Sequence, residues 1–412
     1  LSRPRKVMLM VKAGKPVDIV IDNLIPHLEE DDIIIDGGNS HFEDTERRYQ
    51  KLKDKGIRYI GTGISGGEYG ALHGPSIMPG GEAEAYAEIE DIFTDVAAST
   101  EDGPCVTHLG PRSAGHYVKM VHNGIEYGVM ALLSEVYDIM RKVLDMEPQV
   151  MSKYFREWNQ EHQSYLMEIT YEILERKDEA TGKPLINVIL DRAKQKGTGK
   201  WSAQDALDLG IPIPTINAAV NSRSLSALKG ERVERAGEFG GLDQEKVKEV
   251  QQDDEFMEKL EDALYTGIII AYAEGMKLLQ AASQEYDYNL NLSETARIWE
   301  DGCIIRSALL KPIQKAYQEE ENLINLIMSS QFKDLVKDKS KGLREVAGKA
   351  KTCGIPVPAL NSALDYFDII RAEETPANLI QGQRDYFGAH TYERRDKKGS
   401  FHTEWQDIHN IE

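Results

Sequence analysis

Three short apolar runs, each ending in a glycine-containing turn, alternate with helical patterns over the first 110 residues. The apolar runs are VMLMVKAG, DIIIDGGNS and IRYIGTGISGG, and the helical patterns between them are PVDIVIDNLIPHL and TERRYQKLKDKG. Short buried strands separated by helices predict a parallel sheet, because parallel strands need crossover connections. Ligands bind beyond the carboxyl ends of such strands. We therefore expect Lys12, Asn39 and Ser65, which follow three different strands, at one edge of the sheet.

The strand pattern ends near Ser113, and long helical patterns such as HYVKMVHNGIEYGVMALLSEVYDIMRK follow it. From Asn378 onward the chain has little periodicity and several aromatic residues, which is typical of an extended tail. The predicted fold class is therefore α/β plus all-α. We expect a Rossmann-like parallel-sheet domain at residues 1–112, a large all-helical domain at 113–372 and an extended C-terminal tail at 373–412.

Charge and cysteine usage narrow the classes of function. A net charge of −20 argues against binding of nucleic acid, because phosphate neutralisation needs a basic surface. Cys105, Cys303 and Cys353 are far apart and lack metal-binding or redox spacing, so they predict free thiols in a reducing compartment and no metal site. No apolar run approaches the roughly 18 residues that cross a membrane. We expect a cytoplasmic protein that binds neither nucleic acid nor membrane.

The chain starts with LSRPRK, which is neither a signal peptide nor a start with an initiator methionine. A doubly wound nucleotide-binding domain usually opens with a strand and G-x-G-x-x-G. KAGKPV does not fit that motif, and the glycine-rich GISGGEYGALHG comes only after the third strand. We expect a first βαβ unit upstream of this chain, and poor dinucleotide binding by these 412 residues alone.

The stretch KMVHNGIEYG places a polar stripe on one face of a helix, at a spacing where most helices carry apolar residues. Its members are Lys119, His122, Asn123, Glu126 and Tyr127. A different face, with Met120, Val121, Ile125 and Val129, is the expected packing face. From the spacing alone, a solvated Lys/Glu face is about as plausible as a functional one. Asn123-Gly124 in mid-helix favours function, because both residues weaken a helix.

Three further motifs suit an anionic ligand. KQKGTGKW offers Lys196 and Thr198 around a glycine, and NSRSLSALK offers the guanidinium fork of Arg223. The glycines of SGG would let the backbone approach a ligand closely. Each motif alone is also compatible with ordinary turn chemistry. We expect Asp36 to shape its turn, GPSIMPGG to build a loop and the four tryptophans to pack.

Six blocks, in order along the whole chain, resemble the 6-phosphogluconate dehydrogenase family, the decarboxylating enzymes of the pentose phosphate pathway. They are IIIDGGNS, GISGGEYGALHGPSIMPGG, AGHYVKMVHNGIEYG, KQKGTGKW, SRSLSALKGERV and RDYFGAHTYER. The resemblance implies oxidative decarboxylation of 6-phosphogluconate to ribulose 5-phosphate and carbon dioxide, with reduction of NADP. The features that separate NADP from NAD preference are expected upstream of this chain.

The resemblance also implies roles for individual residues. Lys119 is the implied general base toward the C3 hydroxyl, and Glu126 the implied acid that protonates C1 of the enediol. A lysine base needs desolvation or a cationic neighbour, because an unperturbed lysine titrates near ~10.4. The implied substrate-binding residues are Asn39, Ser65, Gly66, Gly67, His122, Asn123, Tyr127, Lys196, Thr198, Arg223, Arg384 and His390. The implied cofactor-binding residues are Val11, Lys12, Ala13 and Asn39.

The resemblance finally implies a homodimer in which the tail reaches the neighbouring subunit, where Arg384 and His390 complete the substrate site. The aromatic residues of the tail support this, because they would be costly in water unless buried. Two alternatives stay open at this stage. One is a catalytically silent helical or sugar-phosphate-binding fragment, because G-x-G-x-x-G is absent. The other is a different β-hydroxyacid dehydrogenase, against which the Lys196, Thr198 and Arg223 cluster and the tail argue.

Overall fold

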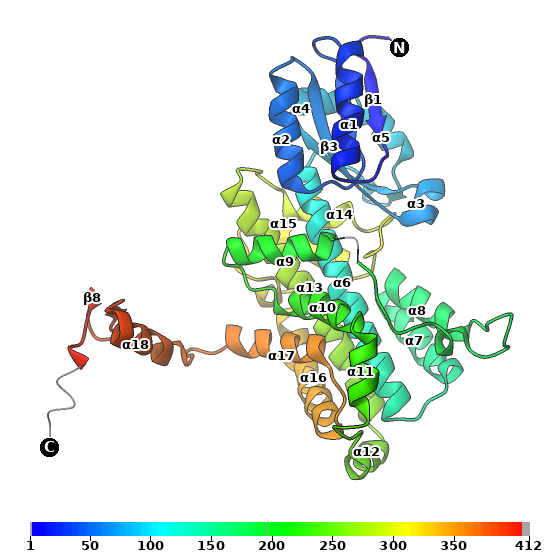
Figure 1. The fold of residues 1–412 in the computed structure, drawn as a ribbon, viewed down its shortest axis with the longest axis vertical. Helices are drawn as coiled ribbons and strands as arrows, with labels where there is room; N and C mark the ends of the chain where they lie inside the picture. Colours follow the sequence, from blue (N-terminus) through cyan, green and yellow to red (C-terminus); the bar gives the residue numbers. More distant parts are fainter. Residues whose placement is uncertain (1, 196, 406–412) are drawn as a thin grey trace. The chain divides into compact units, whose positions relative to one another are not determined.

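The computed structural model describes residues 2–195 and 197–405 and divides the chain into two compact units, Leu1–Leu364 and Asp365–Glu412. The first unit opens with an α/β part, which continues into a helical part (Figure 1). The elements of the α/β part are β1 (Lys6–Leu9), α1 (Lys15–Leu24), η1 (Ile25–His27), β2 (Ile33–Asp36), α2 (Phe42–Lys53), β3 (Arg58–Ser65), α3 (Gly67–His73), β4 (Ser76–Gly81), α4 (Ala83–Ala87), α5 (Glu90–Val96), β5 (Ser99–Thr100) and β6 (Gly103–Pro104).

The main sheet has the order β1-β2-β3-β4, and its first three strands are parallel, as predicted. The fourth strand runs antiparallel to β3, with Ser65 opposite Ser76. The expectation that GPSIMPGG builds a loop is therefore wrong for residues 76–81. Ile77 and Met78 are buried in the sheet, and β4 lies at its end, where Pro79 is tolerated because an edge strand can lack one amide donor.

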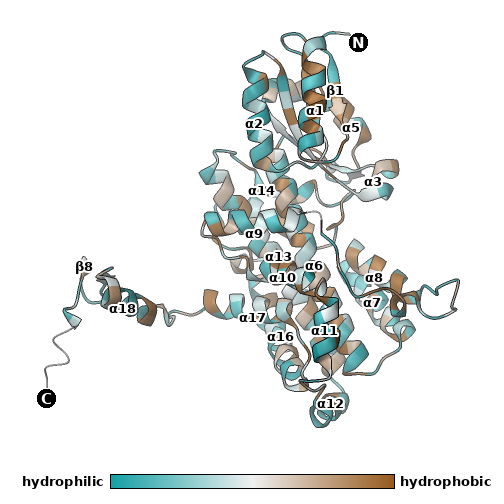
Figure 2. Cartoon of the chain, viewed as in Figure 1, coloured by the Kyte–Doolittle hydropathy of each residue, from teal (hydrophilic) through white to brown (hydrophobic). Residues whose placement is uncertain are grey.

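Helices cover both faces of this sheet because successive side chains of a strand point to opposite sides. On one face Ile34 packs with Val17 and Ile21 of α1 and Leu52 of α2. On the other face a second cluster joins strand residues to α4 and α5; it contains Ile33, Ile35, Ile60, Ile77, Ala85, Tyr86 and Phe93. The visible face of α2 is largely hydrophilic (Figure 2), as expected of an outer layer.

The helical part is built around two long helices, α6 of 29 residues and α13 of 30, and α13 packs against both α6 and α16. No helix among the described residues is both long enough and apolar enough to cross a membrane. The elements are α6 (Ala114–Lys142), α7 (Pro148–His162), α8 (Tyr165–Glu175), η2 (Leu185–Asn187), α9 (Thr198–Asp208), α10 (Pro214–Ser226), α11 (Lys229–Ala236), α12 (Gln244–Gln251), α13 (Phe256–Glu285), α14 (Leu292–Arg297), α15 (Leu310–Glu319), η3 (Leu326–Met328), α16 (Lys333–Cys353) and α17 (Pro358–Ile370).

The second unit begins at Asp365, within α17, and contains α18 (Ala377–Gly388), β7 (Tyr392–Glu393) and β8 (Ser400–Phe401). The prediction of an irregular segment from Asn378 is therefore wrong for residues 377–388, which form a helix. The buried carboxylate of Asp385 holds this helix to the segment that follows β8, because it accepts hydrogen bonds from Thr403 N and Trp405 Nε1 at 3.1 and 2.9 Å. A polar anchor of this kind leaves no apolar stripe in the sequence. The domain boundaries 1–112, 113–372 and 373–412 stay a prediction.

Candidate active site

The N-terminal half of α6 lies unusually close to the sheet because glycines face it. A Cβ on Gly63 of β3 would lie 2.3 Å from Cβ of Lys119, and a Cβ on Gly80 of β4 would lie 2.2 Å from the backbone nitrogen of Gly115. No side chain larger than hydrogen fits at such distances without movement. This close packing puts Lys119 directly beside the end of β3.

Lys119 belongs to a connected group of polar side chains. Its Nζ lies 3.2 Å from Nδ1 of His122, and that nitrogen is 3.0 Å from Oδ1 of Asn123. The other ring nitrogen of His122, Nε2, lies 3.2 Å from Oγ of Ser65 at the end of β3. Lys119 and His122 are buried, and so is the apolar face that contains Met120, Val121, Ile125 and Val129. The start of the stripe is therefore an interior polar cluster and not a solvated surface.

Burial sets the protonation of this cluster. It lowers the pKa of Lys119 to about 8, although the charge of Glu126 acts in the opposite direction. Burial also raises the pKa of the Glu126 carboxyl, against the influence of Lys119 and Arg223. The pKa of His122 lies well below its ordinary value because of burial and the neighbouring lysine. Near neutral pH the site thus combines an amine that is mostly protonated but loses its proton far more readily than an ordinary lysine, a neutral imidazole and a carboxyl group whose pKa is raised.

A second group of residues lies farther along the same face of α6 and is suited to an anion. Nδ2 of Asn123 donates to Oγ1 of Thr198 at 3.0 Å, which ties α6 to the first residue of α9. The guanidinium of Arg223, at the end of α10, lies over the ring of Tyr127 at 3.5 Å from its centroid. A Cβ on Gly199 of α9 would lie 2.4 Å from Cδ2 of Tyr127, so the same ring borders the guanidinium and the first turn of α9, which can both offer donors to a phosphate. Lys196, predicted to join this group, lies outside the described residues.

The carboxyl edge of the sheet borders the cluster, as the sequence predicted. Asn39 follows β2 with φ of +52°, and its amide donates to Ile64 O and accepts from Ile64 N at 3.1 and 2.9 Å. The turn of Asn39 meets the segment after β1, since a Cβ on Gly38 would lie 2.6 Å from the carbonyl oxygen of Val11. Lys12 and Ala13 continue that segment to the start of α1. Three strand ends thus meet in one place.

Two turns, one after β2 and one after β3, shape this edge. Asp36 accepts hydrogen bonds from Gly38 N at 2.9 Å and Ser40 Oγ at 2.6 Å, which confirms that it shapes its turn. Gly66 and Gly67 have φ of +117° and +59°, a region that favours glycine, and they lead from Ser65 into α3. Nothing lies within 4 Å of where a Cβ on Gly67 would stand, so the backbone at that residue is open to close approach by a ligand.

Sequence reasoning missed one wall of the site, the segment from Trp299 to Ile305. The amide of Ile304 donates to Ser65 Oγ at 3.4 Å, and the ring of Trp299 meets the His122 ring edge-on at 5.6 Å between centroids. A Cβ on Gly66 would lie 2.6 Å from the carbonyl oxygen of Gly302. The only local signal was Gly302 itself, which ends the turn DG with φ of +65°.

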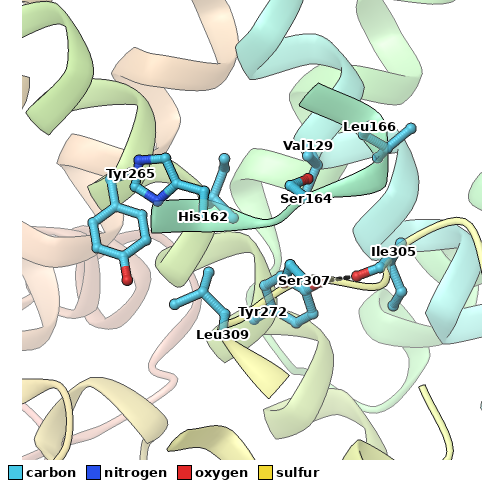
Figure 3. Close-up of a pocket in the computed structure, with 10 residues that line it drawn as sticks. Val129, His162, Ser164, Leu166, Tyr265, Tyr272, Ile305, Ser307 and Leu309 are labelled. Atoms are coloured by element: carbon cyan, nitrogen blue, oxygen red, sulfur yellow. Dashed lines mark hydrogen bonds between the residues drawn. The ribbon is translucent and has the colours of Figure 1, made fainter. Parts of the chain in front are cut away.

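A small cavity on another part of α6 does not belong to this cluster (Figure 3). Its volume of about 10 Å³ has room for a single water molecule and is far too small for a sugar phosphate. At its wall, Tyr272 donates a hydrogen bond to the carbonyl oxygen of Ile305 at 2.5 Å. The lining residues are Val129, His162, Ser164, Leu166, Tyr265, Ile268, Tyr272, Ile305, Ser307 and Leu309.

Two family models match the chain: the NAD binding domain of 6-phosphogluconate dehydrogenase over residues 1–110, and the C-terminal domain of 6-phosphogluconate dehydrogenase over residues 115–405. The chain belongs to the 6-phosphogluconate dehydrogenase family. The resemblance inferred from the six sequence blocks is thereby confirmed, and so is the fold class of a Rossmann-like sheet domain followed by a large helical domain.

Curated relatives and a solved structure of the family match nearly the whole chain. An NADP(+)-dependent, decarboxylating 6-phosphogluconate dehydrogenase of Bacillus subtilis is 52% identical over 98% of this chain and 86% of its own length. A decarboxylating 6-phosphogluconate dehydrogenase of Escherichia coli is 50% identical over 99% of this chain and 86% of its own length. The 6-phosphogluconate dehydrogenase of Plasmodium falciparum, solved apo and with its cofactor NADP+ or its substrate, superimposes with a TM-score of 0.94 at 44% identity, over 98% of this chain and 87% of the other.

Two residues predicted for the site lie in the second unit. Arg384 is on α18, where Nη1 donates to Oε1 of Gln381 at 3.0 Å, and His390 follows the end of that helix. Both side chains are exposed. Within the first unit, by contrast, the predicted residues meet in the two connected groups and the sheet edge described above.

Proposed function

We propose that this chain oxidises and decarboxylates 6-phosphogluconate to ribulose 5-phosphate and carbon dioxide, with NADP as the oxidant. The observation that carries the proposal is the buried Lys119, whose pKa is lowered to about 8, at the junction of the sheet edge and the anion-binding group. Family relatives named as decarboxylating, and a relative solved with NADP+ and with 6-phosphogluconate, support the choice of substrate and cofactor.

Lys119 is the proposed general base. Its neutral amine removes the proton from the C3 hydroxyl as that carbon is oxidised, and the resulting ammonium donates a hydrogen bond to the new C3 carbonyl oxygen. This second contact stabilises the negative charge that develops on that oxygen as carbon dioxide leaves. A pKa near 8 suits both roles, because the group can lose and regain a proton near neutral pH.

Glu126 is the proposed acid of the last step, in which C1 of the enediol receives a proton. It lies two helical turns beyond Lys119 on α6, roughly 10 Å along the helix axis. Long side chains at that separation can reach opposite ends of a short carbon chain. Burial favours the protonated form of Glu126 and so prepares it to donate.

The remaining residues hold the substrate in this proposal. Ser65, Gly66 and Gly67, with Asn39, His122 and Asn123, bind its carboxylate and hydroxyls. Thr198, Arg223 and Tyr127 bind the phosphate together with Lys196. The contact between Asn123 and Thr198 supports one continuous site, since it joins the two groups directly.

The carboxyl edge of the sheet fits a dinucleotide. The absence of a side chain at Gly38 lets the segment after β1 approach the Asn39 turn, and parallel strand ends are where such ligands bind. We assign Val11, Lys12, Ala13 and Asn39 to NADP binding. NADP, when bound, accepts the hydride that leaves C3 of the substrate. Asn39, held through both ends of its amide by Ile64, presents a fixed side chain between cofactor and substrate.

The assembly is proposed to be a cytoplasmic homodimer whose tails exchange, so that Arg384 and His390 act in the partner's site. The apolar side chains of α18 support this, because Leu379 is 65% exposed and Phe387 is 72% exposed. Such residues bury apolar surface when they dock on another chain. The three free cysteines support a reducing compartment.

The decisive experiment measures two products at once. Protein, NADP and carbon-1-labelled 6-phosphogluconate should yield NADPH and labelled carbon dioxide in equal amounts. Formation of NADPH without labelled carbon dioxide would show an oxidation that stops at the keto acid, and would favour a different β-hydroxyacid dehydrogenase.

A further inference from the structure

Glu274 is an acidic side chain in the middle of α13 that has no exposed surface. Its partners are two backbone amides at the start of α10. Oε1 accepts from Thr215 N at 2.9 Å and Oε2 accepts from Ile216 N at 3.1 Å. Burial raises the pKa of this carboxyl to about 8, and the two amide donors oppose that rise. The dipole of α10 acts in the same direction as these donors, because it favours negative charge at the start of the helix.

α10 depends on this contact because it begins without a cap of its own. The residue before the helix is Ile213, whose side chain cannot accept a hydrogen bond, and the first helical residue is Pro214. The next two amides belong to Thr215 and Ile216, which are both buried. Buried amides need a partner, and here it comes from a different helix. The start of α10 is consequently fixed to α13.

The other end of α10 carries Arg223, the guanidinium that lies over the Tyr127 ring. Arg223 follows Thr215 by eight residues, which is ~12 Å along a helix. α10 packs against α6, α9 and α13, so it contacts both the helix of Lys119 and the helix that begins at Thr198. A displacement at the capped end is carried by the rigid helix to the guanidinium.

We propose that Glu274 is a positioning residue for the substrate phosphate: by capping α10 from α13 it sets where Arg223 lies over the Tyr127 ring. Glu274 itself touches neither substrate nor cofactor. The proposal rests on the proposed function, in which Arg223 binds the phosphate of 6-phosphogluconate. It adds a residue that lies three helices farther along the chain and whose hydrogen bonds, among the residues that the structure describes, are with the start of α10.

The test variant is Glu274→Gln, which keeps the size of the side chain but replaces one acceptor with an NH₂ group that faces a backbone N–H. We expect the KM for 6-phosphogluconate to rise about 10-fold, with kcat changed less than about 3-fold and KM for NADP unchanged. Loss of a contact made equally in ground and transition states has this signature. The inhibition constant of inorganic phosphate should rise in parallel, and Glu274→Asp, which keeps both acceptors, should recover part of the loss.

A double-mutant cycle with Arg223→Ala separates positioning from general damage. If Glu274 acts through Arg223, adding Glu274→Gln to Arg223→Ala should raise KM no further. Val346→Ala, which opens a cavity in the buried face of α16, is the control: it should lower the melting temperature and leave KM unchanged. If Glu274→Gln does not fold, the same cycle is run with Glu274→Asp.

Three results would overturn the proposal: a wild-type KM and phosphate inhibition constant in folded Glu274→Gln, an equal rise of KM in the Arg223→Ala background, or an equal rise in Val346→Ala. These outcomes are distinct from failure of the proposed function. If the proposed function were wrong, the wild-type protein itself would release no carbon dioxide from 6-phosphogluconate, whatever the behaviour of the Glu274 variants.

Discussion

Replacement of Lys119 by a weaker amine tests the origin of catalysis most directly. Burial lowers the pKa of this lysine from 10.5 to about 8. At pH 7 an amine with a pKa of 8 is neutral in about one molecule in ten, whereas one with a pKa of 10.5 is neutral in about three in 10,000. Burial thus increases the supply of neutral base roughly 300-fold. We expect kcat/KM to rise with pH and to level off above about 8, because only the neutral amine can accept the proton.

The perturbation has two steps. Lys119→Cys removes the amine and should lower kcat/KM by about 10²–10⁴-fold. Alkylation of the new thiol with 2-bromoethylamine then rebuilds the side chain as thialysine, whose amine is a weaker base because sulfur withdraws electron density. Activity should return, and the rising limb of the pH profile should move to lower pH. The new thiol borders the space that the shortened side chain leaves, whereas burial raises the pKa of Cys105 to about 11 and that of Cys303 to about 12 and makes them poor nucleophiles. Mass spectrometry should find the added aminoethyl group at position 119 and none on the wild-type protein treated with the same reagent.

The assay is NADPH formation at low 6-phosphogluconate over a range of pH, with wild-type protein treated with the same reagent as the control. Two outcomes would refute the assignment. One is a Lys119→Cys protein within a few-fold of wild type. The other is a rebuilt enzyme whose rising limb stays where the wild-type limb lies, since the titrating base would then be another group.

Three further predictions concern the same site. Glu126→Gln should slow turnover by about 10²–10⁴-fold, because the enediol loses its acid, and a variant with wild-type ribulose 5-phosphate formation would exclude that role. Gly63→Ala should lower both the melting temperature and kcat, because the added methyl group overlaps Cβ of Lys119 and overpacking typically costs about 1–3 kcal/mol. An unchanged melting temperature would show that the sheet and α6 can separate freely. Mixing an Arg384→Ala/His390→Ala mutant with a Lys119→Ala mutant should restore activity in heterodimers, and heterodimers without activity would place the tail in its own subunit's site.

The strand ends and the start of α6 were the most predictable parts of the molecule. β1, β2 and β3 and the helices between them follow local patterns, in which period-two or continuous apolar runs meet glycine turns. Ser65, Lys119, His122 and Asn123 are all predicted site residues, and hydrogen-bonding distances connect them. Three of them share one face of α6, and they meet Ser65 because α6 packs closely against β3.

Other features carried no readable local signal. β4 was interpreted as a loop because Pro79 and its neighbouring glycines are turn residues, and only pairing with β3 makes the segment a strand. α18 was missed because its stabilising group, Asp385, is a polar residue that accepts hydrogen bonds from residues up to twenty positions later. In both cases a long-range contact overrides local propensity.

The sequence by itself determined the family, the alternation of strands and helices, and the residue types that carry the proposed chemistry. Only the tertiary structure decided their electrostatic state. Lys119 has the same local sequence whether buried or solvated, and its lowered pKa arises because β3 and the segment at Trp299 exclude water from it. Glu274 is likewise an ordinary acidic residue of a helix until α10 places two backbone amides against it. Protonation and positioning depend on neighbours distant in the chain, and local sequence patterns do not record them.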